Sequence, residues 1–282
     1  MLGHVPALPS ESTLAIDAWP HKGGFMSTAA AILITIPLSH YCEKARWALD
    51  RVALPYREEP HAPLLHRLAT KGDGSGTVPV LLHGGRRIND STAILVHADE
   101  VCGGELLYPR DATWGPEVAA LEEQFDTQLG PHSRRWAYAE LLSQPKLLRS
   151  LWSRGVPLRE ALLLPLITPV ARRLVRAAYK ITPESAGRSL EKVQEVFRQV
   201  DQRLCDGRRF LVGGRFSAAD MTFAALAAPV LFPTEYRAVH PPLDAVSGAM
   251  RAEVQKLRDT DAGRFALRLY SQERHVTLGG VL

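Results

Sequence analysis

The chain has 282 residues, of which 46% are hydrophobic and 23% charged, a composition typical of a globular protein with one large domain or two ordinary ones. Its formal net charge of +4 is mild, and no basic block is interleaved with aromatic residues, so we expect no nucleic-acid partner. The three cysteines, Cys42, Cys102 and Cys205, lack metal-ligand spacing and cannot all pair, which indicates no metal site and a reducing compartment, the cytoplasm.

The first residues do not follow the pattern of a targeting segment. Residues 1–25 contain several prolines, Glu11 and Asp17, and no apolar run of signal-peptide length. We therefore expect residues 1–27 to form a poorly ordered extension. The longest apolar run, residues 161–170, contains two prolines and is far shorter than the roughly 20 residues that a membrane-spanning helix needs. The sequence thus predicts a soluble protein.

Regular elements begin at residue 31. Residues 31–38 form a short apolar run rich in Ile, typical of a buried strand. Residues 41–53 then change to helical spacing, with one small and apolar face from which Lys44, Asp50 and Arg51 are excluded. The following patterns predict a strand at 56–59, a short helix at 64–70, a β-hairpin at 78–83 and 86–89, and a helix at 91–101. This order predicts an α/β thioredoxin-like domain with a mixed four-stranded sheet over residues 28–105.

Strand patterns disappear in the second half of the chain. Residues 104–116 (GELLYPRDATWGP) contain charged residues, Gly and Pro, which is typical of a linker, and we place the linker at residues 106–116. Helical patterns follow at 117–129, 158–180, 184–205, 218–231 and 243–257, the second of them interrupted by Pro165 and Pro169. We therefore predict an all-helical domain over residues 117–282.

Ser39 is the first candidate for chemistry, because it stands where the first strand gives way to the first helix. A helix N-terminus offers unpaired N–H groups and partial positive charge, which together stabilise a thiolate and lower its pKa. The Ser39 hydroxyl can donate to such a thiolate; alternatively, Ser39 is only the N-cap of the helix. Cys42 falls on the apolar face, so we expect it to point inward.

Two further motifs each allow a purely structural and a functional interpretation. In Thr77-Val78-Pro79 the proline keeps Val78 extended, with backbone groups free to pair with an added peptide. The bond before Pro79 is either cis, which turns these groups outward into a cleft, or trans, the commoner isomer. Asp90-Ser91 precedes a helix, and Ser91 is either a simple N-cap or part of a helix start that holds a substrate carboxylate.

Together, residues 39–46 (SHYCEKAR), 77–79 (TVP) and 90–91 (DS) resemble in order and spacing the glutathione site of soluble glutathione S-transferases with a serine at the sulfur. The resemblance implies that Ser39 contacts the glutathione sulfur. It also implies that Val78, before cis Pro79, pairs with the cysteinyl backbone, and that Asp90 and Ser91 hold the γ-glutamyl end. Cys42 and Lys71 are secondary candidates.

The resemblance covers residues 31–108 and extends more loosely through 216–225 (FSAADMTFAA), where Ser217 and Asp220 have the spacing of a helix-capping pair with a structural role. Family members with Cys at the Ser39 position act as thiol transferases, so a Ser there argues against that activity. The helical half is longer than is usual in the family, and parts of it are basic.

The resemblance implies a detoxifying transferase that uses glutathione as co-substrate, attacks a small apolar electrophile bound by the helical half, and works as a cytoplasmic homodimer without a metal. The electrophile site can be walled by Trp114, Trp136, Tyr138 and Trp152, or these side chains are plain core. Two alternatives stay open. One is a non-catalytic binding or stress-response protein of the same fold. The other makes residues 161–170 and their flanking arginines a membrane-surface patch, although we expect no membrane association.

Overall fold

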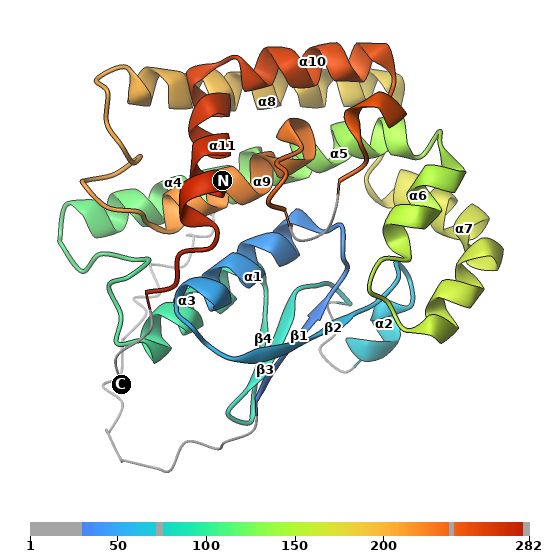
Figure 1. The fold of residues 1–282 in the computed structure, drawn as a ribbon, viewed down its shortest axis with the longest axis horizontal. Helices are drawn as coiled ribbons and strands as arrows, with labels where there is room; N and C mark the ends of the chain where they lie inside the picture. The colour runs from blue at the N-terminus through green and yellow to red at the C-terminus, as the bar shows by residue number, and fades with distance from the viewer. Residues whose placement is uncertain (1–29, 72–75, 237–239, 279–282) are drawn as a thin grey trace, which may run out of the picture.

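The computed structural model describes residues 30–71, 76–236 and 240–278 (Figure 1). The extension expected at residues 1–27 lies outside these ranges. Within them, no helix is both long enough and apolar enough to cross a membrane.

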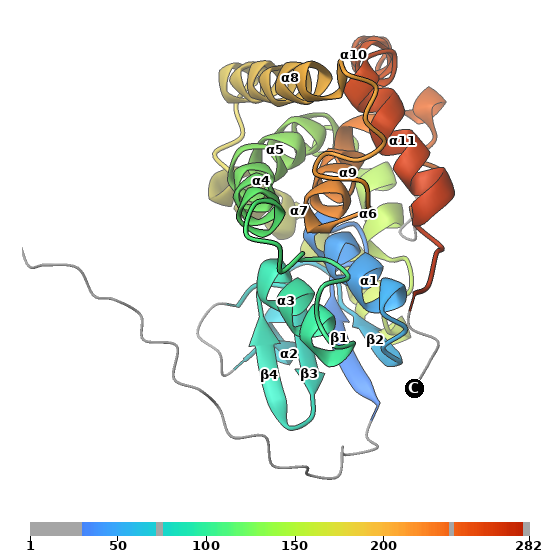
Figure 2. The same ribbon diagram turned by 90° about the vertical axis from the view of Figure 1, so that its left-hand side faces the viewer.

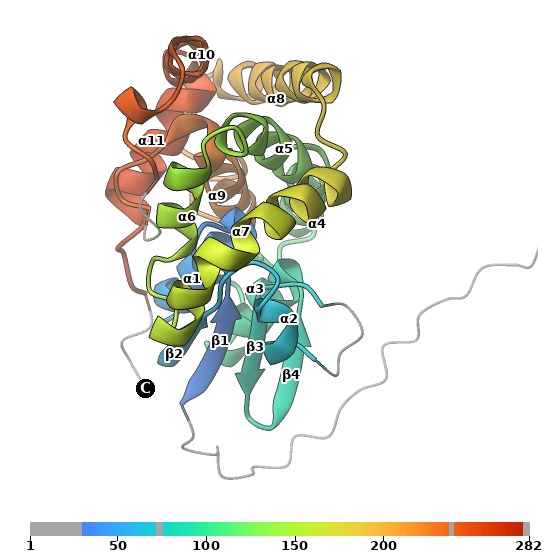
Figure 3. The ribbon, with the colours of Figure 1, turned by 90° about the vertical axis from the view of Figure 1, so that its right-hand side faces the viewer.

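Four strands of the described chain form one mixed sheet. They are β1 (Ala31–Thr35), β2 (Tyr56–Pro60), β3 (Val80–His83) and β4 (Arg86–Asn89), in the spatial order β2-β1-β3-β4. β1 runs parallel to β2 and antiparallel to β3, and β3 and β4 form the expected hairpin. Helices α1 (His40–Arg51) and α3 (Ser91–Val101) cover one face of the sheet, and the short α2 (His66–Ala69) lies on the other (Figures 2 and 3). The predicted thioredoxin-like domain is confirmed.

Helix α1 is buried on almost every side, because it lies between the sheet and the helical half of the protein (Figure 1). The apolar face includes Trp47 and Leu49, which are fully buried. The side chains of Lys44 and Arg51, which lie off this apolar face, are buried as well. Each is compensated by carboxylates from the helical half, which the spacing along α1 cannot reveal.

The second half of the chain is helical, as predicted. Its helices are α4 (Trp114–Gln128), α5 (Gly130–Leu141), α6 (Pro145–Trp152), α7 (Leu158–Ala178), α8 (Pro183–Leu204), α9 (Ala218–Leu231), α10 (Gly248–Arg258) and α11 (Asp261–Glu273), with a 3-10 turn at Leu243–Ala245. Helix α9 is the centre of this half, and every one of its residues is buried. It packs against α1, α4, α5 and α11, so the two halves share one continuous core.

Several boundaries differ from the sequence-based expectation. α4 begins at Trp114, inside the expected linker 106–116, and α5, α6 and α11 were not predicted. α7 continues through Pro165 and Pro169 as one helix. Both prolines are exposed and so lie on the solvent side of the helix, where water can bond to a carbonyl that lacks its helical N–H partner.

The start of α9 is held by the predicted capping pair. The buried carboxylate of Asp220 accepts hydrogen bonds from the Ser217 N–H at 2.8 Å, the Ser217 hydroxyl at 2.9 Å and the Leu211 N–H at 2.8 Å. One side chain therefore fixes both the first turn of α9 and the loop that precedes it.

Candidate functional site

The sheet register brings the three sequence motifs to one end of the sheet. Ile34 near the end of β1 pairs with Val80 at the start of β3, and Val80 also pairs with Asn89 at the end of β4. Ser39 follows β1, Val78 precedes β3 and Asp90 follows β4, so all three lie at the same end of the strands. This end of the sheet is here called the sheet edge. The Val78–Pro79 peptide bond is cis, as predicted.

Ser39 is the N-cap of α1, and its side chain is half-buried. Its Oγ accepts a hydrogen bond from the Cys42 N–H at 3.3 Å. A hydroxyl has one proton to donate besides its acceptor lone pairs, so capping leaves the O–H of Ser39 available to another acceptor. Capping and thiolate stabilisation, the two alternatives left open by the sequence, are therefore compatible.

A cavity of about 250 Å³ lies between the two halves of the protein, and Ser39 and Val78 line it. The sheet domain also contributes His40, Leu64 and Thr77 to its wall. The helical half contributes Arg134 and Tyr138 from α5, Leu174, Val175 and Ala178 from α7, and Tyr179. A site that joins a helix N-terminus to an apolar and aromatic wall suits a ligand with one polar and one apolar end.

The lining of this cavity carries positive charge. Among the described residues that line it, Arg67 and Arg134 are basic and none is acidic. The Arg134 guanidinium lies over the Tyr179 ring, 4.1 Å from its centroid, and its buried Nε has no hydrogen-bond partner among the described residues. Burial, with a further contribution from Arg134, lowers the pKa of His40 to about 3, so this imidazole is neutral at neutral pH. The cavity therefore favours anionic ligands.

Asp90, and not Ser91, is the N-cap of α3. Its carboxylate accepts from the N–H groups of Thr92 at 2.8 Å and Ala93 at 3.4 Å. Ser91 is the first residue of the helix; its side chain is buried, and its hydroxyl has no hydrogen-bond partner in the described part of the chain. Neither residue lines the cavity. The helix therefore begins one residue earlier than a cap at Ser91 would allow, because Asp90 takes the cap position with a positive φ of 77°, which a short carboxylate side chain tolerates while it bonds to the backbone beyond it.

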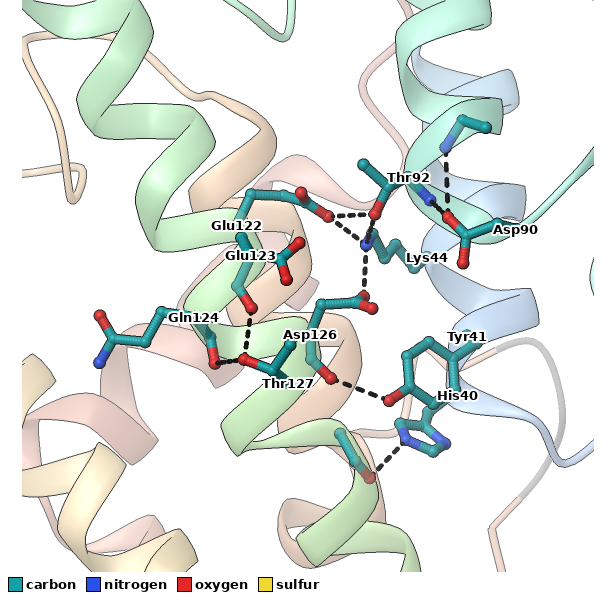
Figure 4. A network of polar contacts seen from close by, with 12 residues as sticks. His40, Tyr41, Lys44, Asp90, Thr92, Glu122, Glu123, Gln124, Asp126 and Thr127 are labelled. Atoms are coloured by element: carbon teal, nitrogen blue, oxygen red, sulfur yellow. Dashed lines mark hydrogen bonds and ion pairs between the residues drawn. The ribbon is translucent and has the colours of Figure 1, made fainter. Parts of the chain in front are cut away.

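A buried ion network that the sequence did not predict lies next to Asp90 (Figure 4). Lys44 of α1 is fully buried, and its Nζ contacts Glu122, Asp126 Oδ1 at 2.7 Å and Thr92 Oγ1 at 3.0 Å. The Thr92 hydroxyl donates to Glu122 at 2.7 Å. Because Thr92 belongs to α3, whose N-cap is Asp90, the network fixes α1, α3 and α4 around the sheet edge.

The first turn of α1 is attached to the junction between α4 and α5 (Figure 4). The Tyr41 hydroxyl donates to the Asp126 carbonyl at 3.0 Å, and His40 Nε2 lies 3.0 Å from the Gly130 carbonyl. A Cβ atom at Gly130 would collide with the Tyr41 hydroxyl, so this position requires glycine. These contacts fix the helix N-terminus at which Ser39 lies.

Apart from Tyr138, the remaining sequence candidates lie away from the cavity. Cys42 is buried as expected, and burial raises the pKa of its thiol. Lys71 is exposed and does not line the cavity. Among the four aromatic residues proposed as walls, Tyr138 lines the cavity, Trp152 is fully buried core, and Trp136 packs against the core. Trp114 remains substantially exposed. In the described ranges, no group of His, Cys, Asp and Glu side chains is arranged to hold a metal ion.

Comparison with known proteins agrees with this architecture. The model of the glutathione S-transferase N-terminal domain matches residues 33–105, and that of the glutathione S-transferase C-terminal domain matches residues 163–249. The chain belongs to the glutathione S-transferase family. A search of curated proteins returned no significant match to this chain.

Several solved structures share the fold of this chain at low sequence identity. Poplar glutathione transferase F1 is 16% identical with a TM-score of 0.52, over 86% of this chain and 99% of that one. Beta-etherase LigF from Sphingobium sp. strain SYK-6 is 18% identical with a TM-score of 0.53, over 85% and 99%. FzlA from C. crescentus is 22% identical with a TM-score of 0.53, over 85% and 92%.

Proposed function

We propose that the protein is a transferase that activates the thiol of glutathione, its co-substrate, for attack on a small electrophile. Membership of the glutathione S-transferase family supports a glutathione-related activity. The observation that carries the finer proposal is the position of Ser39, at the N-terminus of α1 and on the wall of a cavity formed by both halves of the protein.

In this proposal the Ser39 hydroxyl donates to the glutathione sulfur, while its oxygen continues to accept from the Cys42 N–H. The donated hydrogen bond and the helix N-terminus both favour the thiolate, so the pKa of the bound thiol falls below the ordinary value for cysteine, about 8.5. The thiolate then forms a C–S bond with the electrophile, and the leaving group departs with the electron pair of the bond that breaks.

The other candidate residues orient glutathione along the sheet edge. The backbone of Val78, held next to Pro79, pairs with the cysteinyl unit. Asp90 is exposed at the same edge and presents its carboxylate to the γ-glutamyl ammonium group, and Ser91 lies beside it. Arg67 and Arg134 give the cavity the positive potential that an anionic peptide requires.

The size of the cavity supports a small electrophile. Its 250 Å³ is less than the roughly 300–1,000 Å³ of sites that enclose drug-sized ligands. It therefore encloses the sulfur end of glutathione and a compact co-substrate, which contacts the apolar wall formed by Leu174 and Val175 of α7. The proposal includes a homodimer in the cytoplasm, which sedimentation analysis and cell fractionation test.

Replacement of Ser39 by Ala is expected to raise the pKa of bound glutathione by about one to two units, since one charge-assisted hydrogen bond contributes about 1.5–3 kcal/mol. A raised thiol pKa means less thiolate at neutral pH, and turnover with a panel of small electrophiles should fall in proportion. The thiolate absorbance of the bound ligand against pH measures the shift.

Cys42→Ala is the matched control, because Cys42 is buried away from the cavity and should affect mainly packing. If Cys42→Ala removes the thiolate signal and Ser39→Ala does not, the two roles are reversed. Glutathione binding without turnover of any electrophile would favour the non-catalytic alternative.

A further inference from the structure

The outer face of α7 carries an exposed row of large apolar side chains. These residues, here called the α7 stripe, are between 45% and 76% exposed and comprise Leu158, Leu162, Leu163, Leu166, Val170 and Leu174. Five of them recur at every fourth residue and so follow one ridge along the helix. The opposite face, with Leu164, Thr168 and Ala171, is buried. Most of the large exposed apolar side chains of the described chain thus lie on one helix.

Specific contacts fix the orientation of this helix. The Glu160 carboxylate accepts from the Ala62 N–H at 2.8 Å, and its other oxygen lies 2.7 Å from His61 Nδ1. Arg172 Nε donates to the Leu142 carbonyl at 2.9 Å. α7 is therefore attached to the sheet domain at its N-terminal end and to the end of α5 further along. The stripe cannot turn inward without breaking these contacts.

The chain segment that carries the α7 stripe is basic, and the carboxylates near Arg176, those of Glu140 and Glu253, come from other helices. Residues 145–180 contain eight Lys and Arg residues and a single acidic residue, Glu160, which is buried. On α7 itself, Arg159 is exposed near one end of the stripe, and Arg173 and Arg176 near the other. An apolar centre with cationic ends and no exposed carboxylate is typical of a helix that lies in a membrane interface.

We propose that the α7 stripe docks this protein on the surface of an anionic phospholipid bilayer. The 21 residues of α7 present a ridge on the outside of the molecule, suited to a broad, flat partner (Figure 3). Leucine side chains enter the boundary between headgroups and acyl chains, and the arginines contact lipid phosphates beside them. This proposal departs from the expectation, drawn from the sequence, that the protein does not associate with membranes.

Docking would also place the cavity at the lipid surface. Leu174 belongs to the stripe and lines the cavity, and Val175 lines it as well. Under the proposed function, an apolar electrophile dissolved in the bilayer would reach the thiolate along this helix. The docking itself does not depend on that function.

The test is co-sedimentation of the full chain with phosphatidylcholine vesicles, with and without phosphatidylglycerol. The parent protein should bind the anionic vesicles, and added salt should weaken binding. Arg173→Gln/Arg176→Gln should weaken it about thirtyfold, because each basic residue near an anionic surface contributes about fivefold. Leu162→Glu/Leu166→Glu should weaken it at least as much. The matched controls, Arg188→Gln/Arg198→Gln on α8 and Val96→Glu on α3, should bind like the parent.

Three results would overturn the proposal: no binding of the parent, equal binding of the α7 and control variants, or concentration-dependent self-association that Leu162→Glu/Leu166→Glu abolishes. The last would make the stripe an interface between copies of the chain. Circular dichroism of each variant confirms that the fold is intact. The assay contains no glutathione, so its failure is distinct from failure of the proposed function.

Discussion

Lys44→Met is expected to lower the free energy of unfolding by about 3–5 kcal/mol, which is typical when one partner of a buried ion pair is removed. The Lys44 ammonium is fully buried between Glu122 and Asp126, so the substitution leaves both carboxylates without their cation. Burial already raises the pKa of Asp126, and Lys44 opposes that rise. Urea denaturation at neutral pH measures the loss.

The pH dependence gives this prediction a specific signature. Without Lys44, the pKa of Asp126 should rise further, and protonation should relieve the unpaired charge. The stability difference between Lys44→Met and the parent is therefore expected to be largest at neutral pH and to shrink as the pH falls toward the ordinary carboxyl range, about 4. Glu123→Gln, at the exposed neighbour of Glu122, should change stability by no more than about 0.5 kcal/mol. Equal stability of Lys44→Met and the parent at neutral pH would show that the ion network contributes nothing to the free energy of unfolding.

Asp220→Ala is expected to destabilise the fold by about 2–4 kcal/mol, because it leaves the N–H groups of Leu211 and Ser217 buried without an acceptor. α9 is the common core of both halves, so the loss should appear in one cooperative transition and not as local fraying. The midpoint of urea unfolding measures it. Asp244→Ala, at an exposed aspartate in the 3-10 turn, is the control. A loss below about 1 kcal/mol would contradict the capping role.

The fold of the sheet domain was predictable because its signals are local. The Ile-rich run of β1, the small apolar face of α1 and the Gly84–Gly85 turn each specify their own element, and their order specifies the sheet. The helices that were missed have weaker local signals. α5 follows α4 directly and contains Gly, Pro and charged residues, while the charged residues of α11 form long-range contacts that the sequence does not display.

The candidate site was predictable only where chain order determines position. Ser39, Val78 and Asp90 each follow or precede a strand, so the register alone brings them to one edge. The roles of Lys44 and Arg134 depend on partners from other helices: Lys44 meets Glu122 across 78 positions, and Arg134 enters the cavity from α5. A lysine in a helical pattern otherwise indicates a solvated face.

The central claim is that glutathione binds at the sheet edge beside Ser39, and isothermal titration calorimetry of the full chain with glutathione tests it most directly. The account predicts saturable binding with one site per chain. It also predicts at least about tenfold weaker binding by Asp90→Asn, which keeps an acceptor for capping α3 but loses the charge that faces the γ-glutamyl ammonium group. A folded protein that gives no binding heat and no thermal shift with millimolar glutathione would contradict the account.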